Sequence, residues 1–349
     1  MPTLSVVIVT HESRQAVAAT LAALSAQLRD GDELIVVDNA SADGTVDEVR
    51  ALAPGAIVVE TGANLGFAAA CNRGAEAASA ELLCLLNPDA VPLPGWREAV
   101  ELPHTDGRGW AAWQALVTAA AGREINTRGG VLHFTGIGWA GGAGMKLGEL
   151  PASESLALEQ PGFVSGACLV LARELYVRLG GMAERFFLYH EDVDLSLRVR
   201  LGGGRLGVEP AARVDHDYEF EKGKQKWRYL ERNRWATLIR TYPAALLALL
   251  MPALLATELA LVFAAAAGGW LPQKLRAWAE TLIWLPRLLV ERRRIQAART
   301  IGAGEFAAGL TATLDSAYLG RAGRSRALAA VLGAYWSLVR RLLGAGDAG

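Results

Sequence analysis

The chain has 349 residues, 52% of them hydrophobic, and a formal net charge of −1. Its length suits one large α/β domain with an appendage. Its mean hydropathy of +0.22 is high for a soluble enzyme, yet it excludes a chain made mostly of membrane spans.

Charge is distributed unevenly along the chain. Residues 219–349 contain 19 Lys and Arg against 9 Asp and Glu, so residues 1–218 have a net charge of −11. This split predicts a catalytic domain at 1–218 and a basic helical region at 219–349 that faces anionic lipid or phosphate. Because the basic residues flank an apolar run and form no known reading motif, we expect no nucleic-acid partner.

The cysteines and the N-terminus indicate a reducing compartment. Cys71, Cys84 and Cys168 stand among apolar or small residues without metal-type spacing, which predicts buried free thiols. The N-terminus runs directly into an apolar segment of strand length, so we expect no secretory signal.

Apolar runs of strand length alternate with helical patterns over the first ninety residues. Strands are predicted at Leu4–Thr10, Glu33–Asp38, Ala56–Glu60 and Leu82–Asn87, and helices at Arg14–Gln27, Asp43–Leu52 and Ala68–Ala78. This alternation predicts a mostly parallel sheet with helices on both faces. Ligands bind such sheets beyond the carboxyl ends of the strands, so we look for functional residues there.

The next part of the chain is less regular. Residues 119–161 are rich in Gly and are predicted as loops over the site. A further strand is predicted at Phe163–Ala172. Apolar residues at helical spacing over 193–201 predict a helix with Glu191 and Asp192 in its first turn.

Asp89 and His216 are candidate metal ligands. Asp89 follows the fourth predicted strand in Asn87-Pro88-Asp89, and its carboxylate is a hard oxygen ligand suited to Mg²⁺ or Mn²⁺. The tripeptide is equally typical of a plain turn. An isolated His is usually not a ligand, but the position of His216 downstream of Asp192 supports a metal or phosphate role as a hypothesis.

Three further acidic residues have both a functional and a structural interpretation. A carboxylate such as Asp192 or Glu191 can serve as a general base, yet acids in a first helical turn also stabilise the helix dipole. Asp38, at the end of an apolar strand, can accept hydrogen bonds from a nucleobase or ribose, or cap the following turn.

Taken in order, these segments resemble glycosyltransferase family 2, which has the GT-A fold, and in particular its rhamnosyltransferase-like members. The matching stretches are VVIVTHE (6–12), IVVDNASADG (35–44), NLGFAAACNRG (64–74), LLNPDA (85–90), SGACLVL (165–171) and GGMAERFFLYHEDVDLSLRVR (180–200), followed by His216. Each motif alone is weak evidence, but the probability that all of them occur in this order by chance is very small.

The resemblance implies an inverting glycosyltransferase of cell-envelope glycan synthesis. Its donor would be a nucleotide-diphosphate sugar, dTDP-rhamnose or a UDP- or GDP-sugar, and its acceptor a hydroxyl of a glycan or lipid-linked glycan. Asp192 would be the general base and Glu191 its acceptor-side partner, while Asp89 and His216 would bind the divalent cation. Residues implied to bind or line the donor are Thr10, His11, Glu12, Asp38, Asn64, Gly66, Phe67, Asn72 and Asn87.

The sequence departs from the family pattern at two positions. His11 stands where Tyr or Phe is common beside the base, and Asn87 replaces the first carboxylate of the metal motif. The second change removes one charge, so we expect weaker or indirect cation binding.

The apolar run Pro243–Leu271 is long enough to span a bilayer. Pro252 and Glu258 interrupt it, however, and nearby basic clusters and six tryptophans fit helices that lie in the membrane interface. We therefore expect contact with an anionic membrane surface at the cytoplasmic face, either spanning or interfacial. A soluble helical subdomain is the alternative. A last amphipathic helix is predicted at Ala327–Leu343.

Two other functions fit the sequence less well. A sugar-phosphate nucleotidylyltransferase needs a basic Gly-rich loop near the first strand, where only Arg14 is found. A non-catalytic nucleotide-sugar-binding protein or membrane scaffold would not need Asp89, Glu191, Asp192 and His216 together. The sugar, the base, the acceptor and the oligomeric state, a homo-oligomer included, stay open.

Overall fold

The computed structural model describes residues 1–149, 160–217, 223–315 and 325–344. The chain divides into two compact units. The sheet unit comprises residues 1–130, 140–199 and 204–218, and the helical unit comprises residues 131–139, 200–203 and 219–349.

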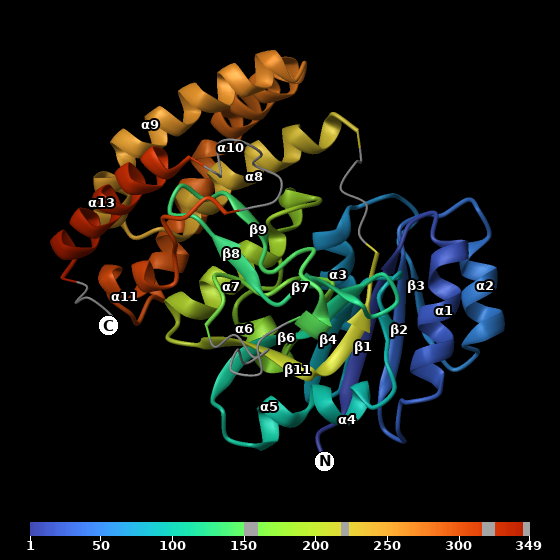
Figure 1. The fold of residues 1–349 in the computed structure, drawn as a ribbon. Helices are drawn as coiled ribbons and strands as arrows, with labels where there is room; N and C mark the ends of the chain where they lie inside the picture. The colour runs from blue at the N-terminus through green and yellow to red at the C-terminus, as the bar shows by residue number, and fades with distance from the viewer. Residues whose placement is uncertain (150–159, 218–222, 316–324, 345–349) are drawn as a thin grey trace. The chain divides into compact units, whose positions relative to one another are not determined.

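The first half of the sheet unit is parallel (Figure 1). Strands β1 (Leu4–Thr10), β2 (Glu33–Asp38), β3 (Ile57–Glu60) and β4 (Leu82–Leu86) pair in the order β3-β2-β1-β4. Helices α1 (Arg14–Ser25), α2 (Thr45–Leu52) and α3 (Phe67–Ala77) connect them. These elements confirm the predicted alternation to within three residues at each end, because the apolar runs are long enough to be buried on both sheet faces.

The second half makes the sheet mixed. Strand β10 (Cys168–Ala172) runs antiparallel to both β4 and β6 (Trp110–Ala119), and β11 (Arg205–Asp215) runs parallel to β6. The short β5 (Val91–Pro92) pairs with β11, and β7 (Glu124–Thr127) pairs with β6. The strand predicted at Phe163–Ala172 is therefore shorter than expected.

Helices cover both faces of this sheet. One core contains buried side chains of α1, α2 and α4 (Trp96–Val100), and the other contains those of α3, α6 (Arg173–Arg178) and α7 (Glu191–Leu201). A short helix α5 (Leu102–Thr105) follows α4. All three cysteines are free and buried, as predicted, and burial raises the pKa of the Cys71 thiol well above its ordinary value.

The prediction of loops over residues 119–161 was wrong for part of that segment. Besides β7, it contains β8 (Gly130–Leu132), β9 (Gly138–Ala140) and the 3₁₀ turn η1 (Leu147–Glu149); residues 150–159 lie outside the described range. The strands form because β7 is an edge partner for β6 and β8 pairs with β9. At Gly130 the glycine does not indicate a loop. It leaves room for the Phe163 ring, because a Cβ at this position would lie 2.4 Å from that ring.

The helical unit contains α8 (Gln225–Thr241), α9 (Ala244–Ala267), α10 (Leu271–Ala297), α11 (Ala303–Ala308) and α13 (Arg326–Leu342). α9 continues through Pro252 as one helix. Within the described residues, α9 is the one helix with the length and apolar composition to cross a membrane, and 22% of its most apolar window is buried.

Glu258, the acid inside the apolar run, belongs to a cluster of four charges from α8, α9 and α10. Its carboxylate pairs with Arg234 and with Lys274, whose Nζ lies 2.8 Å from Glu258 Oε2. Glu231 pairs with the same two cations. Burial alone would raise the pKa of Glu231, but Arg234 and Lys274 together lower it. The cluster therefore carries no net charge, which makes a largely buried acid in α9 tolerable.

Candidate active site

The carboxyl ends of β1 and β2 are joined by the buried side chain of Asp38. Its carboxylate accepts hydrogen bonds from Thr10 Oγ1 (2.8 Å), Ser41 N (2.9 Å) and Ser41 Oγ (2.6 Å). Asp38 is 3% exposed and Thr10 fully buried. Both residues therefore fix the end of the sheet, and a contact from Asp38 to a nucleobase stays a prediction.

His11 and Glu12 continue β1 as an exposed loop. His11 Nδ1 lies 3.0 Å from the carbonyl oxygen of Asn39, and Glu12 Oε1 accepts a hydrogen bond from Ala42 N at 2.8 Å. Glu12 has a positive φ of 52°. The two side chains thus line the loop after β2, at the edge where ligands bind such sheets.

The turn before α3 is built around Gly66. The Asn64 side chain accepts a hydrogen bond from Gly66 N (3.0 Å), and the buried Asn39 donates to Gly66 O (3.3 Å). Phe67 N donates to Phe187 O at 2.7 Å. A Cβ at Gly66, where φ is +83°, would lie 2.6 Å from that same Phe187 oxygen, so only glycine fits.

Asn72 uses its amide to hold the segment that leads to α7. Its Oδ1 accepts hydrogen bonds from Tyr176 Oη (2.6 Å) and Met182 N (2.9 Å), and its Nδ2 donates to Met182 O (3.0 Å) and to Glu184 Oε1 (3.2 Å). Four hydrogen bonds fill the capacity of this side chain. Asn72 therefore positions the segment and leaves little capacity for a ligand.

Asn87, Asp89 and His216 meet where β4 and β11 end. His216 Nε2 lies 3.0 Å from Asp89 Oδ1 and 3.5 Å from Asn87 Nδ2. The imidazole is 4% exposed, whereas the Asp89 side chain is 46% exposed. A hydrogen bond of 2.8 Å from His216 N to Thr118 O on β6 fixes the position of this histidine.

This pair fits part of a divalent-cation site. Two neighbouring ligands of an octahedral ion with bonds of about 2.1 Å lie about 3 Å apart, which matches the Asp89–His216 distance. Among the described residues, no group of three or more His, Cys, Asp and Glu side chains is placed to hold a metal. Phosphate oxygens and water would have to supply the other ligands, in keeping with the missing carboxylate at Asn87.

Asp192 is anchored at the start of α7. Its Oδ2 accepts a hydrogen bond from Gly166 N at 3.1 Å, and its Oδ1 accepts one from Val193 N at 2.7 Å. The carbonyl oxygen of Ala167, the residue after Gly166, accepts a hydrogen bond from Asn87 N at 3.1 Å. Residues 166–167 thereby connect Asp192 to the end of β4, so both lie at the same sheet edge.

Glu191 and Asp192 differ in protonation although they are adjacent. Burial, with the charge of Asp192 as a second cause, raises the pKa of Glu191 to about 8, and Glu191 Oε2 has no hydrogen-bond partner among the described residues. Burial also raises the pKa of Asp192, but two backbone N–H groups oppose this shift. Of the two carboxyl groups, the surroundings therefore favour Asp192 as the charged one and Glu191 as the protonated one.

The segment before α7 has a strained backbone. Phe187, Tyr189 and His190 all have positive φ, at 65°, 70° and 68°. Non-glycine residues in this region cost about 1 kcal/mol or more each and gather at functional sites. The strained segment leads directly into Glu191, and Phe187 also carries the carbonyl that holds Phe67.

Three of these positioning residues had no role predicted from the sequence. Asn39, Gly166 and Phe187 lie inside the motifs that were recognised, but their roles depend on contacts between segments far apart in the chain. For Asn39 a signal existed, because an amide directly after a strand-ending Asp is suited to tie adjacent loops.

The profile "Glycosyl transferase family 2" matches residues 5–115. The N-acetylglucosaminyl-diphospho-decaprenol L-rhamnosyltransferase of Mycobacterium tuberculosis is 28% identical over 258 residues, which cover 68% of this chain and 83% of that protein.

Two solved structures share the fold. GalNAc-T7 with UDP, GalNAc and Mn²⁺ superposes with a TM-score of 0.57 at 18% identity over 71% of this chain and 50% of that one. The mannosyltransferase PcManGT of Pyrobaculum calidifontis, in complex with GDP-Man and Mn²⁺, superposes with a TM-score of 0.50 at 21% identity. The superposition covers 85% of this chain and 86% of that one. Together with the ordered motifs and the sheet topology, these similarities show a glycosyltransferase with the GT-A fold, and its residues 5–115 match glycosyltransferase family 2.

Proposed function

We propose that this glycosyltransferase moves a sugar from a nucleotide-diphosphate donor to an acceptor hydroxyl with inversion, using Asp192 as general base. The observation that carries the proposal is the connection at one sheet edge between Asp192 and the Asn87–Asp89–His216 group through residues 166–167. This edge of the sheet would thus carry both a general base and part of a cation site.

The donor would bind beyond β1 and β2. The loops that carry His11, Glu12 and Asn64 surround that end, and Asp89 would face the diphosphate. A bound Mg²⁺ or Mn²⁺, held in part by Asp89 and His216, would supply charge neutralisation for the leaving diphosphate. The similarity to an L-rhamnosyltransferase makes dTDP-rhamnose the first donor to test, ahead of UDP- and GDP-sugars.

Asp192 would take the acceptor proton. The acceptor oxygen bonds to the anomeric carbon as the bond from that carbon to the diphosphate oxygen breaks, and the hydroxyl proton passes to the Asp192 carboxylate. One such displacement inverts the anomeric centre. Neutral Glu191 would leave the negative charge on Asp192 and donate its own proton in a hydrogen bond on the acceptor side.

The acceptor would be a glycan or a lipid-linked glycan of the cell envelope. The relative's name specifies a decaprenol-linked acceptor, and α9 exposes Leu255, Leu259 and Phe263 at 60–66%. The basic helical unit would then rest on the anionic cytoplasmic face of the membrane. Flotation of the full-length protein with anionic liposomes at low salt tests this contact, and an absence of binding would exclude it.

A thermal-shift screen in detergent tests the donor class. UDP, GDP and dTDP and their sugars are compared with and without Mn²⁺, because a ligand that binds only the folded protein raises Tm. We expect a metal-dependent rise with one nucleotide, and a smaller rise in Asp89→Asn. A well-folded protein that responds to none of these ligands would contradict the proposal.

A further inference from the structure

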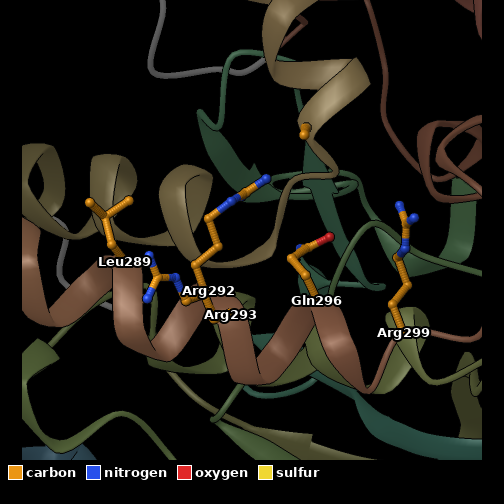
Figure 2. A pocket seen from close by; sticks show the side chains of 6 residues that line it. Leu289, Arg292, Arg293, Gln296 and Arg299 are labelled. Atoms are coloured by element: carbon orange, nitrogen blue, oxygen red, sulfur yellow. The ribbon is translucent and has the colours of Figure 1, made fainter.

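A cavity of about 430 Å³ lies within the helical unit. Its lining residues are Ala244, Leu289, Arg292, Arg293, Gln296 and Arg299. Figure 2 shows Arg292 and Gln296 extending from the same side of α10, as expected for a spacing of four residues, and Arg299, just beyond the end of α10, extending in the same direction. We refer to it as the arginine pocket.

The arginine pocket is preorganised by the end of α8. The Arg292 guanidinium donates to the carbonyl oxygens of Ile239 (2.6 Å) and Tyr242 (2.7 Å), and Gln296 Nε2 donates to Thr241 O (2.9 Å). These are last-turn carbonyls that an α-helix leaves without intrahelical partners. Two of the lining side chains therefore keep their positions without a ligand.

The positive charge of this pocket is not neutralised by the described residues. No acid lines it, and the nearby Glu291 is taken up by Arg240 and by Arg287 (2.9 Å). Burial, with the charge of Arg299 as the second cause, lowers the pKa of Arg292. Several guanidinium groups that repel one another favour a bound anion, and planar guanidinium groups suit phosphate in particular.

The pocket shares a residue with an exposed apolar stripe of α9. Ala244, which lines it, is the first residue of α9, and the exposed positions 248, 251, 255, 259 and 263 follow at helical spacing on the same side. A helix N-terminus also favours an anion. A ligand that fits both features combines a phosphate group with an apolar chain.

We propose that the arginine pocket binds the phosphate group of a membrane lipid whose chain lies along the exposed stripe of α9. This inference rests on the membrane contact in the proposed function and adds a specific headgroup site to it. The phosphate can belong to a bilayer phospholipid or to a polyprenyl phosphate, and the vesicle compositions below separate these two sources.

The test measures binding of the full-length protein to vesicles. Phosphatidylglycerol vesicles are compared with cholesteryl hemisuccinate vesicles of equal surface charge, which present carboxylates instead of phosphates. A third set contains a few mole per cent of undecaprenyl phosphate in neutral phosphatidylcholine. Arg293→Gln with Arg299→Gln alters the pocket, and Arg276→Gln with Arg294→Gln removes the same charge from exposed positions of α10.

We expect the wild type to prefer phosphate vesicles, and the pocket variant to lose about tenfold more affinity for them than the control variant, the worth of about one charge-assisted hydrogen bond. A loss confined to the undecaprenyl phosphate set would assign the pocket to the polyprenyl lipid, and a loss with phosphatidylglycerol to bilayer phospholipid.

Equal losses in the two variants, or no preference for phosphate over carboxylate, would overturn the proposal in favour of diffuse surface attraction. Calorimetric binding of soluble pyrophosphate that is as tight as binding of the vesicles, and that is lost in the pocket variant, would overturn the lipid assignment. Circular dichroism establishes that both variants fold. The nucleotide-induced rise in Tm should persist in the pocket variant, so failure of this inference and failure of the proposed function are distinguishable.

Discussion

Replacing Glu191 by Gln should flatten the pH dependence of stability. In the folded protein burial raises the pKa of Glu191 from 4.5 to about 8, whereas the unfolded chain titrates near the ordinary value. The contribution of Glu191 to stability is fully present below its pKa in the unfolded chain. It is lost as the pH rises through the pKa that Glu191 has in the folded protein. Between pH 5 and pH 8 the wild type should therefore lose about 3 kcal/mol of unfolding free energy on account of Glu191.

Denaturant unfolding at pH 5 and at pH 8 measures this loss directly. Glu191→Gln cannot titrate, and any constant cost of burying its amide cancels in the difference between the two pH values. Asp194→Asn is the matched control, because Asp194 on the same helix pairs with Arg198 at 2.7 Å. This control should lower stability at both pH values and keep the wild-type difference. If Glu191→Gln also keeps the wild-type difference, Glu191 is ionised in the folded protein and the division of charge with Asp192 is wrong.

Three other substitutions test separate parts of the structure. His216→Ala should reduce the Mn²⁺-dependent rise in Tm with nucleotide by removing one of two cation ligands, and an unchanged rise would exclude a ligand role. Gly66→Ala should lower the free energy of unfolding by about 3 kcal/mol, because the new Cβ would meet Phe187 O. Chemical denaturation measures this loss. Gly62→Ala is the control for backbone strain alone, because Gly62 has a φ of +71° but open space around it. Glu258→Gln should lower the free energy of unfolding by about 3 kcal/mol, because it leaves the charges of Arg234 and Lys274 undercompensated. Glu280→Gln is the control: its ion pairs are more exposed, so the loss should be less than about 1 kcal/mol. Similar losses in the two variants would count against the charge cluster.

The parallel half of the sheet could be predicted because its strands are long apolar runs. Leu4–Thr10 and Glu33–Asp38 were predicted with the bounds that the structure has. Strand β6 was not predicted, because Ala, Gln and Leu in WAAWQALVTA favour helix. Pairing with β10 on one side and β11 on the other overrides that preference, and such long-range pairing leaves no local signal.

The site was predictable as a set of motifs and not as a set of roles. Asp89 and His216 are far apart in the chain, and their pairing follows from β4 and β11 ending at one edge of the sheet. Asn72 shows the limit, because its motif suggests a donor-side residue while its amide is filled by the segment before α7. The difference between Glu191 and Asp192 depends on the hydrogen bond from Gly166 N, which no spacing in the sequence predicts.

Asp192→Asn tests the central claim most directly. The carboxamide has nearly the same shape but cannot take a proton, and loss of a general base costs about 10² to 10⁴ in rate. Donor affinity by calorimetry and turnover by product formation are measured on the same preparation, with Asp194→Asn as the control for changes in α7. We expect turnover to fall by at least about a hundredfold with donor affinity unchanged. Turnover close to that of the wild type, or a loss of donor affinity as large as the loss of turnover, would contradict the role of Asp192 as the base.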